Sequence, residues 1–250
     1  MKQQWRLFLM ALGFLTRLPL PAIKGFDPAE LNDAARYFPL VGMIVGLLAV
    51  LVLMASLHLH LPVMVAISLS MVASVWLTGA FHEDGLADSM DGLGGGWTKE
   101  QALTIMKDSR IGSYGAIALV LALLLKFVSL SYISLEILPC VMLAAHAVSR
   151  LAAVLVIASQ EYVREEGKAK PLAHKLSAAS LGVALFTGFA PLALLPAGLW
   201  LALVPVVLVW LWFSRKLRHR LGGYTGDCLG AMQQLTELAF YLGVLLCVAN

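Results

Sequence analysis

The chain has 250 residues, of which 60% are hydrophobic and only 13% are charged, and its mean hydropathy is +0.84. These values exclude an ordinary soluble domain and indicate an all-α, polytopic membrane protein with room for about seven spans of roughly 20 residues. The net charge of +3 is small, and its clustering in a few loops is typical of membrane orientation and phosphate contact rather than nucleic-acid binding. Cys140, Cys228 and Cys247 have neither paired nor metal-ligand spacing, so we expect no disulfide and no zinc site.

The first segment, residues 5–20, is too short and too basic for a comfortable span, and an interfacial or re-entrant helix is expected there. No boundary suggests a second domain, so residues 1–250 are expected to form one integral-membrane domain, with spans at 38–57, 63–80, 112–132, 137–157, 178–195, 198–213 and 231–249. Gly42 and Gly46, four residues apart, permit close packing of the first span. Thr98 and Gln101 predict a helix start with a capping box.

The distribution of basic residues predicts the orientation of the chain. Nearly all Lys and Arg lie at the N-terminus and in segments 81–111, 159–177 and 214–230, and the turns at 58–62, 133–136 and 196–197 contain none. The positive-inside rule therefore places the polar segments on the cytoplasmic face. Within the expected spans, we expect Lys126 to snorkel outward and Arg150 to point toward the acidic segment described next. Arg17 is explained equally well as a cytoplasmic anchor or as a ligand contact.

An acidic segment at residues 79–92 interrupts the apolar pattern and holds four carboxylates and His82 within ten residues. If the segment is helical, Asp84, Asp88 and Asp91 share one face and repel one another. A cation should therefore lie among them, and Mg²⁺ prefers carboxylate oxygens. The alternative is a charged loop that only faces water, but ionisable groups at membrane depth are usually functional.

Three further segments bring charge to the same side of the membrane. Lys107, Asp108 and Arg110 follow the acidic segment, and a glycine-rich turn at 222–227 can approach a phosphate through its backbone N–H groups. A mixed-charge loop at 161–175 adds further cations, namely Arg164, Lys168, Lys170 and Lys175. Aspartates that hold Mg²⁺ beside Lys and Arg suit phosphoryl or nucleotidyl transfer, because the cations offset charge on the phosphorus centre.

Other classes of protein remain open at this point. The fragment Asp88-x-x-Asp91-Gly92 matches the opening of the CDP-alcohol phosphotransferase motif, but the Ala-Arg pair that should follow is absent. An ion-coupled transporter also places acids at membrane depth, although usually near the midplane, whereas these acids cluster at one interface. A non-catalytic membrane scaffold needs no such array of acids and bases.

The segments 82–92 and 105–112 resemble the signature blocks of the cobalamin synthase (adenosylcobinamide-GDP ribazoletransferase) family. The resemblance is collinear over nearly the whole chain and includes shorter blocks at 16–19, 38–42, 147–150, 162–167 and 222–227. It implies the last assembly step of the cobalamin nucleotide loop, in which adenosylcobinamide-GDP reacts with α-ribazole or its 5′-phosphate and GMP leaves. It also implies Mg²⁺ dependence and a prokaryotic cytoplasmic (inner) membrane, with the lipid bilayer as a partner. The oligomeric state stays open, a homo-oligomer included.

The resemblance further implies roles for individual residues. The metal ligands would be Asp84, Asp88 and Asp91, with Asp108 completing the shell. Phosphate would be contacted by Lys107, Arg110, Arg150, Gly226 and Asp227, with Lys107 also counted among the catalytic residues. His82 or a spare aspartate could take the hydroxyl proton. Glu83 stands where we expect an apolar residue in relatives, which disfavours a metal role for it.

Overall fold

The computed structural model describes residues 2–21, 27, 29–164 and 176–248, so that Lys168, Lys170 and Lys175 lie outside the described residues. Regular structure in the described residues is helical, apart from one isolated parallel bridge between Tyr162 and Tyr224. The α-helices are α1 (Lys2–Leu15), α2 (Ala29–Ala34), α3 (Phe38–His58), α4 (Val63–Thr78), α5 (Phe81–Gly95), α6 (Lys99–Ile105), α7 (Ser113–Tyr132), α8 (Leu138–Ser159), α9 (Ala178–Phe189), α10 (Leu203–Leu221) and α11 (Gly226–Val248). The 3-10 helices are η1 (Ala35–Tyr37), η3 (Ala190–Leu194) and η4 (Ala197–Ala202).

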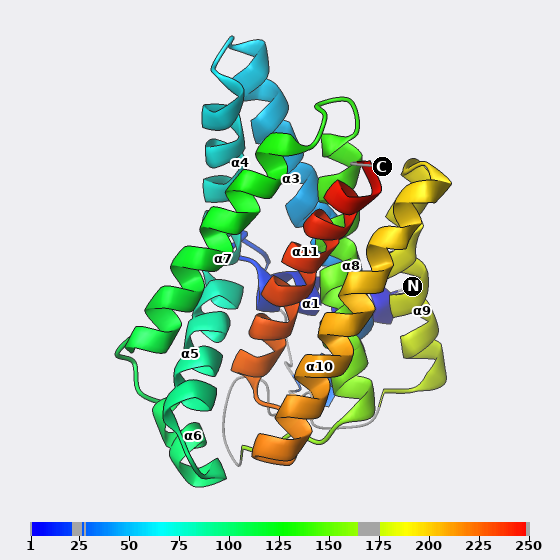
Figure 1. Cartoon of the computed structure of the whole chain (residues 1–250). Helices are drawn as coiled ribbons and strands as arrows, with labels where there is room; N and C mark the ends of the chain where they lie inside the picture. Colours follow the sequence, from blue (N-terminus) through cyan, green and yellow to red (C-terminus); the bar gives the residue numbers. More distant parts are fainter. Residues whose placement is uncertain (1, 22–26, 28, 165–175, 249–250) are drawn as a thin grey trace.

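The long helices form a bundle with α8 in its interior (Figure 1). This helix packs against α3, α9 and α11, and most of its side chains are buried. The contact with α3 is close because glycine stands at residues 42 and 46. A Cβ at Gly42 would overlap the carbonyl oxygen of His146, and one at Gly46 would lie 3.1 Å from the His146 side chain. The predicted close packing of the first span is therefore confirmed.

The helices confirm a polytopic helical membrane protein, but not the expected count of about seven spans. Five stretches in the described part of the chain are long and apolar enough to cross a membrane, namely Glu30–His58, Ser113–Tyr132, Leu138–Ser159, Ala197–Leu221 and Gly226–Val248. A sixth results if the bent pair α4 and α5 is one span. The segment expected at 178–195 forms only a shorter apolar helix, Ala178–Leu194.

Most of the predicted boundaries agree with the structure. The spans expected at 38–57, 112–132 and 137–157 correspond to α3, α7 and α8, and the capping box of Thr98 and Gln101 is present at the start of α6. The helix α10 continues through the basic run to Leu221, because Lys and Arg are good helix formers and favour the last turn of a helix. The first helix, α1, ends at Leu15 and is not among the candidate spans.

The break between α4 and α5 positions the acidic segment. Gly79 and Ala80 both have left-handed backbone conformations, with φ of +66° and +57°, and the two helices meet at 84°. Gly79 adopts this conformation without strain, whereas Ala80 carries a Cβ that disfavours it. A side chain at Gly79 would also overlap the guanidinium of Arg17. The bend lets α5 leave the line of α4 and pack between α7 and α11.

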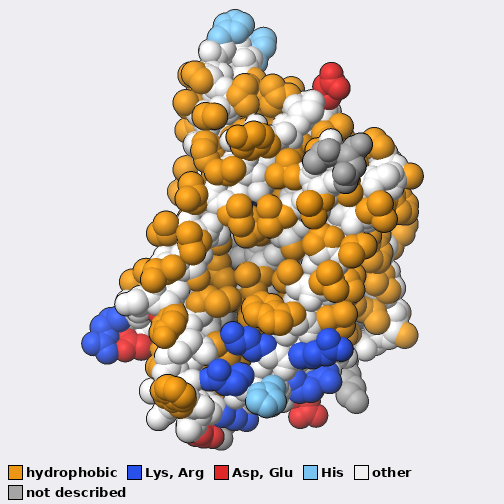
Figure 2. All heavy atoms as spheres, viewed as in Figure 1, with side chains coloured by type: hydrophobic (Ala, Val, Ile, Leu, Met, Phe, Trp, Pro, Cys, Tyr) orange, Lys and Arg blue, Asp and Glu red, His pale blue; other side chains and the backbone are white. Residues whose placement is uncertain are grey.

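Charged side chains on the face shown in Figure 2 are concentrated at one end of the bundle. Lys and Arg gather where α6 and the C-terminal turns of α10 lie, and apolar side chains cover the middle of the molecule. Helices α4 and α7 expose many large apolar side chains, among them Val72, Trp76 and Val120. This is the surface expected where helices face lipid.

Candidate active site

The acidic segment is helical and forms most of α5, so that Asp84, Asp88 and Asp91 share one face. Asp84 is exposed, Asp88 is half-buried and Asp91 is buried. His82 is buried and points away from this face, because residues two apart on a helix are rotated by roughly 200°. The spacing thus separates the imidazole from the nearest aspartate.

The first turn of α11 lies directly against α5. A Cβ at Gly85 would lie 2.7 Å from the carbonyl oxygen of Asp227, and one at Gly230 would lie 3.3 Å from the Cα of Gly85. Glycine at both positions lets the two backbones touch. Asp227 thereby joins Asp84 and Asp88, and the negative charges of the three carboxylates repel one another.

One described cation belongs to this cluster. The Nη2 atom of Arg164 lies 2.8 Å from Oδ2 of Asp227. The segment of Arg164 is held by two backbone hydrogen bonds, in which Val163 donates to the Tyr224 carbonyl and Tyr224 donates to the Glu161 carbonyl. Residues 161–164 and 224–227, which belong to segments about sixty residues apart in the sequence, therefore meet beside α5.

Asp91 has a different environment from the other two acids of its face. Its oxygens accept hydrogen bonds from the backbone N–H groups of Gly112 at 2.7 Å and Gly115 at 2.8 Å. These are N–H groups at the start of α7, which have no partner within their own helix. Asp91 therefore fastens α5 to α7. Among the described residues, neither Asp84 nor Asp88 accepts a hydrogen bond or forms an ion pair.

The structure does not bring the second predicted block into this cluster. Lys107 and Arg110 are exposed in the connection between α6 and α7. Arg110 forms an ion pair of 2.6 Å with Asp108, and hydrogen bonding from Arg110 lowers the pKa of Asp108 to about 2. Asp108 thus pairs with its own neighbour, which uses carboxylate oxygens that the predicted metal shell would need.

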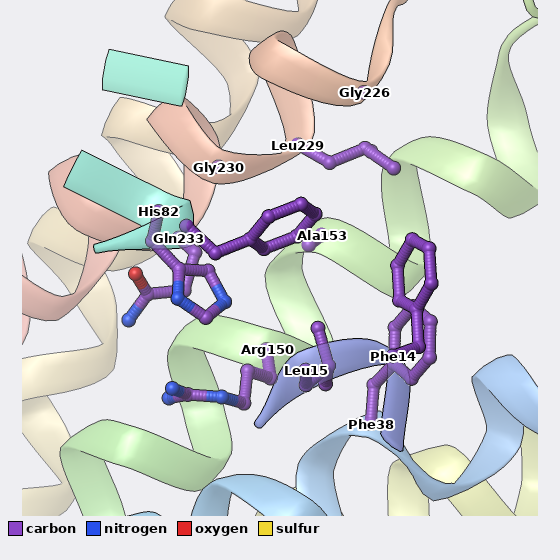
Figure 3. A pocket seen from close by; sticks show the side chains of 11 residues that line it. Phe14, Leu15, Phe38, His82, Arg150, Ala153, Gly226, Leu229, Gly230 and Gln233 are labelled. Atoms are coloured by element: carbon purple, nitrogen blue, oxygen red, sulfur yellow. The ribbon is translucent and has the colours of Figure 1, made fainter. Parts of the chain in front are cut away.

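Arg150 was expected to point toward the acidic segment, but it forms no described contact with the α5 carboxylates. Its Nη1 atom donates to the backbone carbonyl of His146 at 3.0 Å and lies 3.2 Å from the Nδ1 atom of the same residue. Arg150 lines a small pocket with His82 and Gln233, and apolar side chains that include Phe14 and Phe38 line the rest of it (Figure 3). His82 and Arg150 thus lie together in this pocket, on the side of α5 away from its aspartates.

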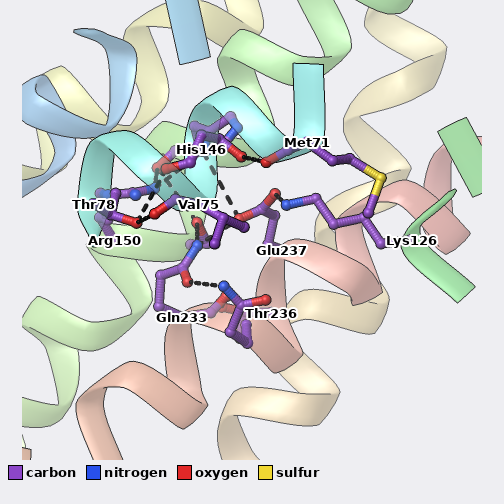
Figure 4. A network of polar contacts seen from close by, with 12 residues as sticks. Met71, Val75, Thr78, Lys126, His146, Arg150, Gln233, Thr236 and Glu237 are labelled. Atoms are coloured by element: carbon purple, nitrogen blue, oxygen red, sulfur yellow. Dashed lines mark hydrogen bonds and ion pairs between the residues drawn. The ribbon is translucent and has the colours of Figure 1, made fainter. Parts of the chain in front are cut away.

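Next to this pocket lies a buried polar network that sequence reasoning missed (Figure 4). Lys126 of α7 forms an ion pair of 2.6 Å with Glu237 of α11, and the side chains are 8% and 1% exposed. Glu237 also accepts hydrogen bonds from Gln233 and Tyr241. The expected outward snorkelling of Lys126 is therefore wrong, because a carboxylate lies within reach inside the bundle. The sequence feature that could have predicted this pair is the presence of one acid, Glu237, and one base, Lys126, within apolar spans.

The network reaches the acidic helix through Glu83. The side-chain amide of Gln234 donates to Glu83 at 2.9 Å and to Gln233 at 3.0 Å. Glu83 is buried against the helix bundle, whereas its neighbour Asp84 is exposed. The hydrogen bond of Glu83 with Gln234 therefore anchors α5 to α11.

Whether these side chains can hold Mg²⁺ depends on the donor set. In the described part of the chain, no three His, Cys, Asp or Glu side chains form a group that could hold a metal ion. Mg²⁺, however, usually binds one or two carboxylates and completes its shell with water and substrate phosphates. Asp84 and Asp88 offer hard oxygen donors, form no described ion pair and are repelled by Asp227, and Arg164 is the described cation that offsets part of this repulsion at Asp88. This pair fits an ion that arrives with a phosphate-bearing substrate.

The fold and the site define a polytopic membrane enzyme whose acids and cations gather at one end of a helix bundle. The profile of the cobalamin-5-phosphate synthase family matches residues 7–245, and the chain belongs to this family. An adenosylcobinamide-GDP ribazoletransferase from Shewanella piezotolerans is 48% identical over 260 aligned residues, which cover 100% of this chain and 98% of that protein. One from Ralstonia pickettii is 47% identical, with 98% and 97% covered. No solved structure matches the chain.

Proposed function

We propose that the chain is an adenosylcobinamide-GDP ribazoletransferase, the activity for which its relatives are named. The reaction joins α-ribazole or its 5′-phosphate to adenosylcobinamide-GDP and completes the nucleotide loop of cobalamin. A ribazole hydroxyl oxygen forms a bond to the phosphorus on the cobinamide side. The bond between that phosphorus and the GMP oxygen breaks, and GMP leaves with the electron pair.

The observation that carries this proposal is the cluster of Asp84, Asp88 and Asp227 at the contact of α5 and α11. Asp84 and Asp88 are the residues that would hold Mg²⁺. When bound, the metal would supply positive charge against the charge that develops on the phosphate oxygens. Arg164 keeps Asp227 in place and adds a cation beside the cluster. Lys107 and Arg110 are exposed and raise the local concentration of anionic substrate.

The hydroxyl proton passes to a spare aspartate of the cluster rather than to His82. The imidazole of His82 lines the pocket with Arg150 (Figure 3), and the helical repeat turns it away from the aspartate face of α5. Asp227 lies beside Asp84 and Asp88 and is not one of the two proposed metal ligands. Of the two bases that the sequence left open, the spare aspartate is therefore the better placed.

We further propose that the site faces the cytoplasm from a prokaryotic inner membrane. The concentration of Lys and Arg at the end of the bundle with α6 and the end of α10 supports this orientation. The turn between α3 and α4 contains no Lys or Arg and lies at the opposite end (Figure 1). Water-soluble substrates then reach α5 without crossing the bilayer.

The test measures GMP release by the purified full-length protein in detergent, where transport across a membrane is impossible. Asp84→Asn and Asp88→Asn are expected to lower kcat by about a hundredfold or more, or about 3 kcal/mol, since each removes one charge from the metal site. Glu100→Gln, an exposed acid of α6, is the matched control and should retain activity. Excess EDTA should abolish release, and added Mg²⁺ should restore it.

Two results would contradict the assignment. Absence of GMP release with both substrates and Mg²⁺ would exclude the transferase activity. Near-normal kcat in the folded Asp84→Asn and Asp88→Asn variants would place the catalytic site elsewhere.

A further inference from the structure

A groove between α4 and α7 plays no part in the proposed reaction. It encloses about 1230 Å³, its open side included. Its walls are mostly apolar, and Arg17, Gly79 and Ala80 line it where α4 ends. The wall residues are Ser68, Met71, Val72, Val75, Trp76, Leu123 and Phe127. The groove is therefore an apolar slot with a single cation in its lining.

Arg17 is fixed at this place by the backbone around it. The backbone N–H group of Arg17 donates to the backbone carbonyl of Leu77 at 2.8 Å. The guanidinium lies against Gly79, where any side chain would overlap it. The guanidinium makes only a long contact of 3.5 Å with the Gly79 carbonyl, and no described carboxylate forms an ion pair with it. A cation beside lipid is costly unless an anion pairs with it.

The depth of Arg17 in the membrane follows from the length of α4. This helix has 16 residues. It is thus about 24 Å long and does not quite cross a hydrocarbon layer of about 30 Å. Helix α4 starts at the end of the bundle opposite the basic end (Figure 1), and Arg17 packs against Leu77 and Gly79 where α4 ends, so Arg17 lies in the leaflet at the basic end. The phosphate groups of lipids in that leaflet are within reach of its side chain.

We propose that the groove binds one anionic phospholipid of the leaflet at the basic end. The phosphate pairs with Arg17, and an acyl chain lies between α4 and α7 against Val72 and Phe127. The ring of Trp76, which is 79% exposed, lies next to the lipid, as aromatic residues near membrane surfaces do. A free phosphate ion leaves the apolar walls uncovered, whereas a phospholipid matches both the charge and the walls. This inference does not depend on the transferase activity.

The experiment uses delipidated, full-length protein in detergent, to which phosphatidylglycerol or phosphatidylethanolamine is added. Bound lipid is counted by native mass spectrometry. The wild type should bind one phosphatidylglycerol about five-fold more tightly than phosphatidylethanolamine, the ratio that one basic residue near a membrane surface contributes. Arg17→Gln should lose this preference and Arg17→Lys should keep it. Arg215→Gln removes an exposed cation of α10 and should change nothing.

A second variant tests the groove itself. Val72 is 63% exposed in the wall, so Val72→Trp fills the slot without altering the core. It should weaken binding of both lipids, and it decides the matter if Arg17→Gln does not fold. Unchanged preference in Arg17→Gln, or unchanged lipid binding in Val72→Trp, would overturn the proposal. Displacement of the lipid by millimolar inorganic phosphate would show a simple anion site and would overturn it as well.

Discussion

The buried pair of Lys126 and Glu237 leads to a quantitative prediction about stability. Lys126→Met removes the cation but keeps the apolar stem, so packing changes little. Glu237 then stays in the bundle interior with its side chain 1% exposed and without its closest cation. Hydrogen bonds from Gln233 and Tyr241 remain, and His146 lies 3.8 Å away.

The size of the effect follows from two opposing terms. Two unit charges at the 2.6 Å of this pair attract by about 6 kcal/mol at an effective dielectric constant near 20. Taking each ion out of water costs several kcal/mol, so the intact pair contributes little net stability. Removing one partner leaves the other uncompensated, which costs about 3–5 kcal/mol. The remaining donors to Glu237 place Lys126→Met near 3 kcal/mol.

The assay is the free energy of unfolding in mixed micelles, measured by titration with sodium dodecyl sulfate. Lys126→Met/Glu237→Gln removes both charges and should recover most of the loss. Together with the single variant Glu237→Gln, it completes a double-mutant cycle whose coupling energy should be at least about 2 kcal/mol. Lys99→Met removes an exposed lysine of α6 and serves as the control. A loss below about 0.5 kcal/mol for Lys126→Met, or equal losses for the single and double variants, would refute this reasoning.

The remaining predictions concern the fastening of α5, the α4–α5 bend and the orientation. Asp91→Ala leaves two N–H groups at the start of α7 unpaired and should lower the free energy of unfolding by about 2–3 kcal/mol in the same titration. Gly79→Ala should destabilise the protein by more than about 1 kcal/mol, whereas Ala80→Gly relieves a left-handed alanine and should be neutral or stabilising. In a cysteine-free background, Trp97→Cys should react with a membrane-impermeant thiol reagent only from the cytoplasm, and Leu59→Cys only from outside, because both positions are exposed at opposite ends.

Each of these predictions has an outcome that contradicts it. Wild-type stability of Asp91→Ala would mean that its two hydrogen bonds do not hold α5 and α7 together. If Ala80→Gly loses more stability than Gly79→Ala, the left-handed bend does not persist in the membrane. Labelling of Trp97→Cys and Leu59→Cys from the same side would exclude the proposed orientation.

Local patterns in the sequence predicted the helices well and the partners of their polar residues poorly. The apolar runs predicted α3, α7 and α8, and the spacing of the acids predicted the face of α5. Both depend only on residues a few positions apart. His82 was grouped with Asp84 because they are close in the sequence, yet the helix turns them to different sides. The helical repeat alone is sufficient to predict that His82 and Asp84 point to different sides.

Other side chains could not be placed from the sequence at all. Asp91 was predicted to share the role of Asp88, but it binds the start of α7. Lys126 was expected to reach outward, but Glu237 of another helix lies 2.6 Å from it. Arg164 pairs with Asp227, which is distant in the sequence. Each outcome depends on the rotation and tilt of one helix against another.

The sequence by itself determined that the chain is helical and membrane-embedded, with its basic residues at one end and three aspartates on one face of a helix. These properties follow from hydropathy and from the helical repeat, which act within a single segment. The resemblance already placed Asp227 in the substrate site, but only the tertiary structure decided that it lies directly beside Asp84 and Asp88 and that Asp91 and Glu83 hold α5 in the bundle. The physical reason is that a buried polar group takes whichever partner packing places within hydrogen-bond distance, and packing is set by all helices together.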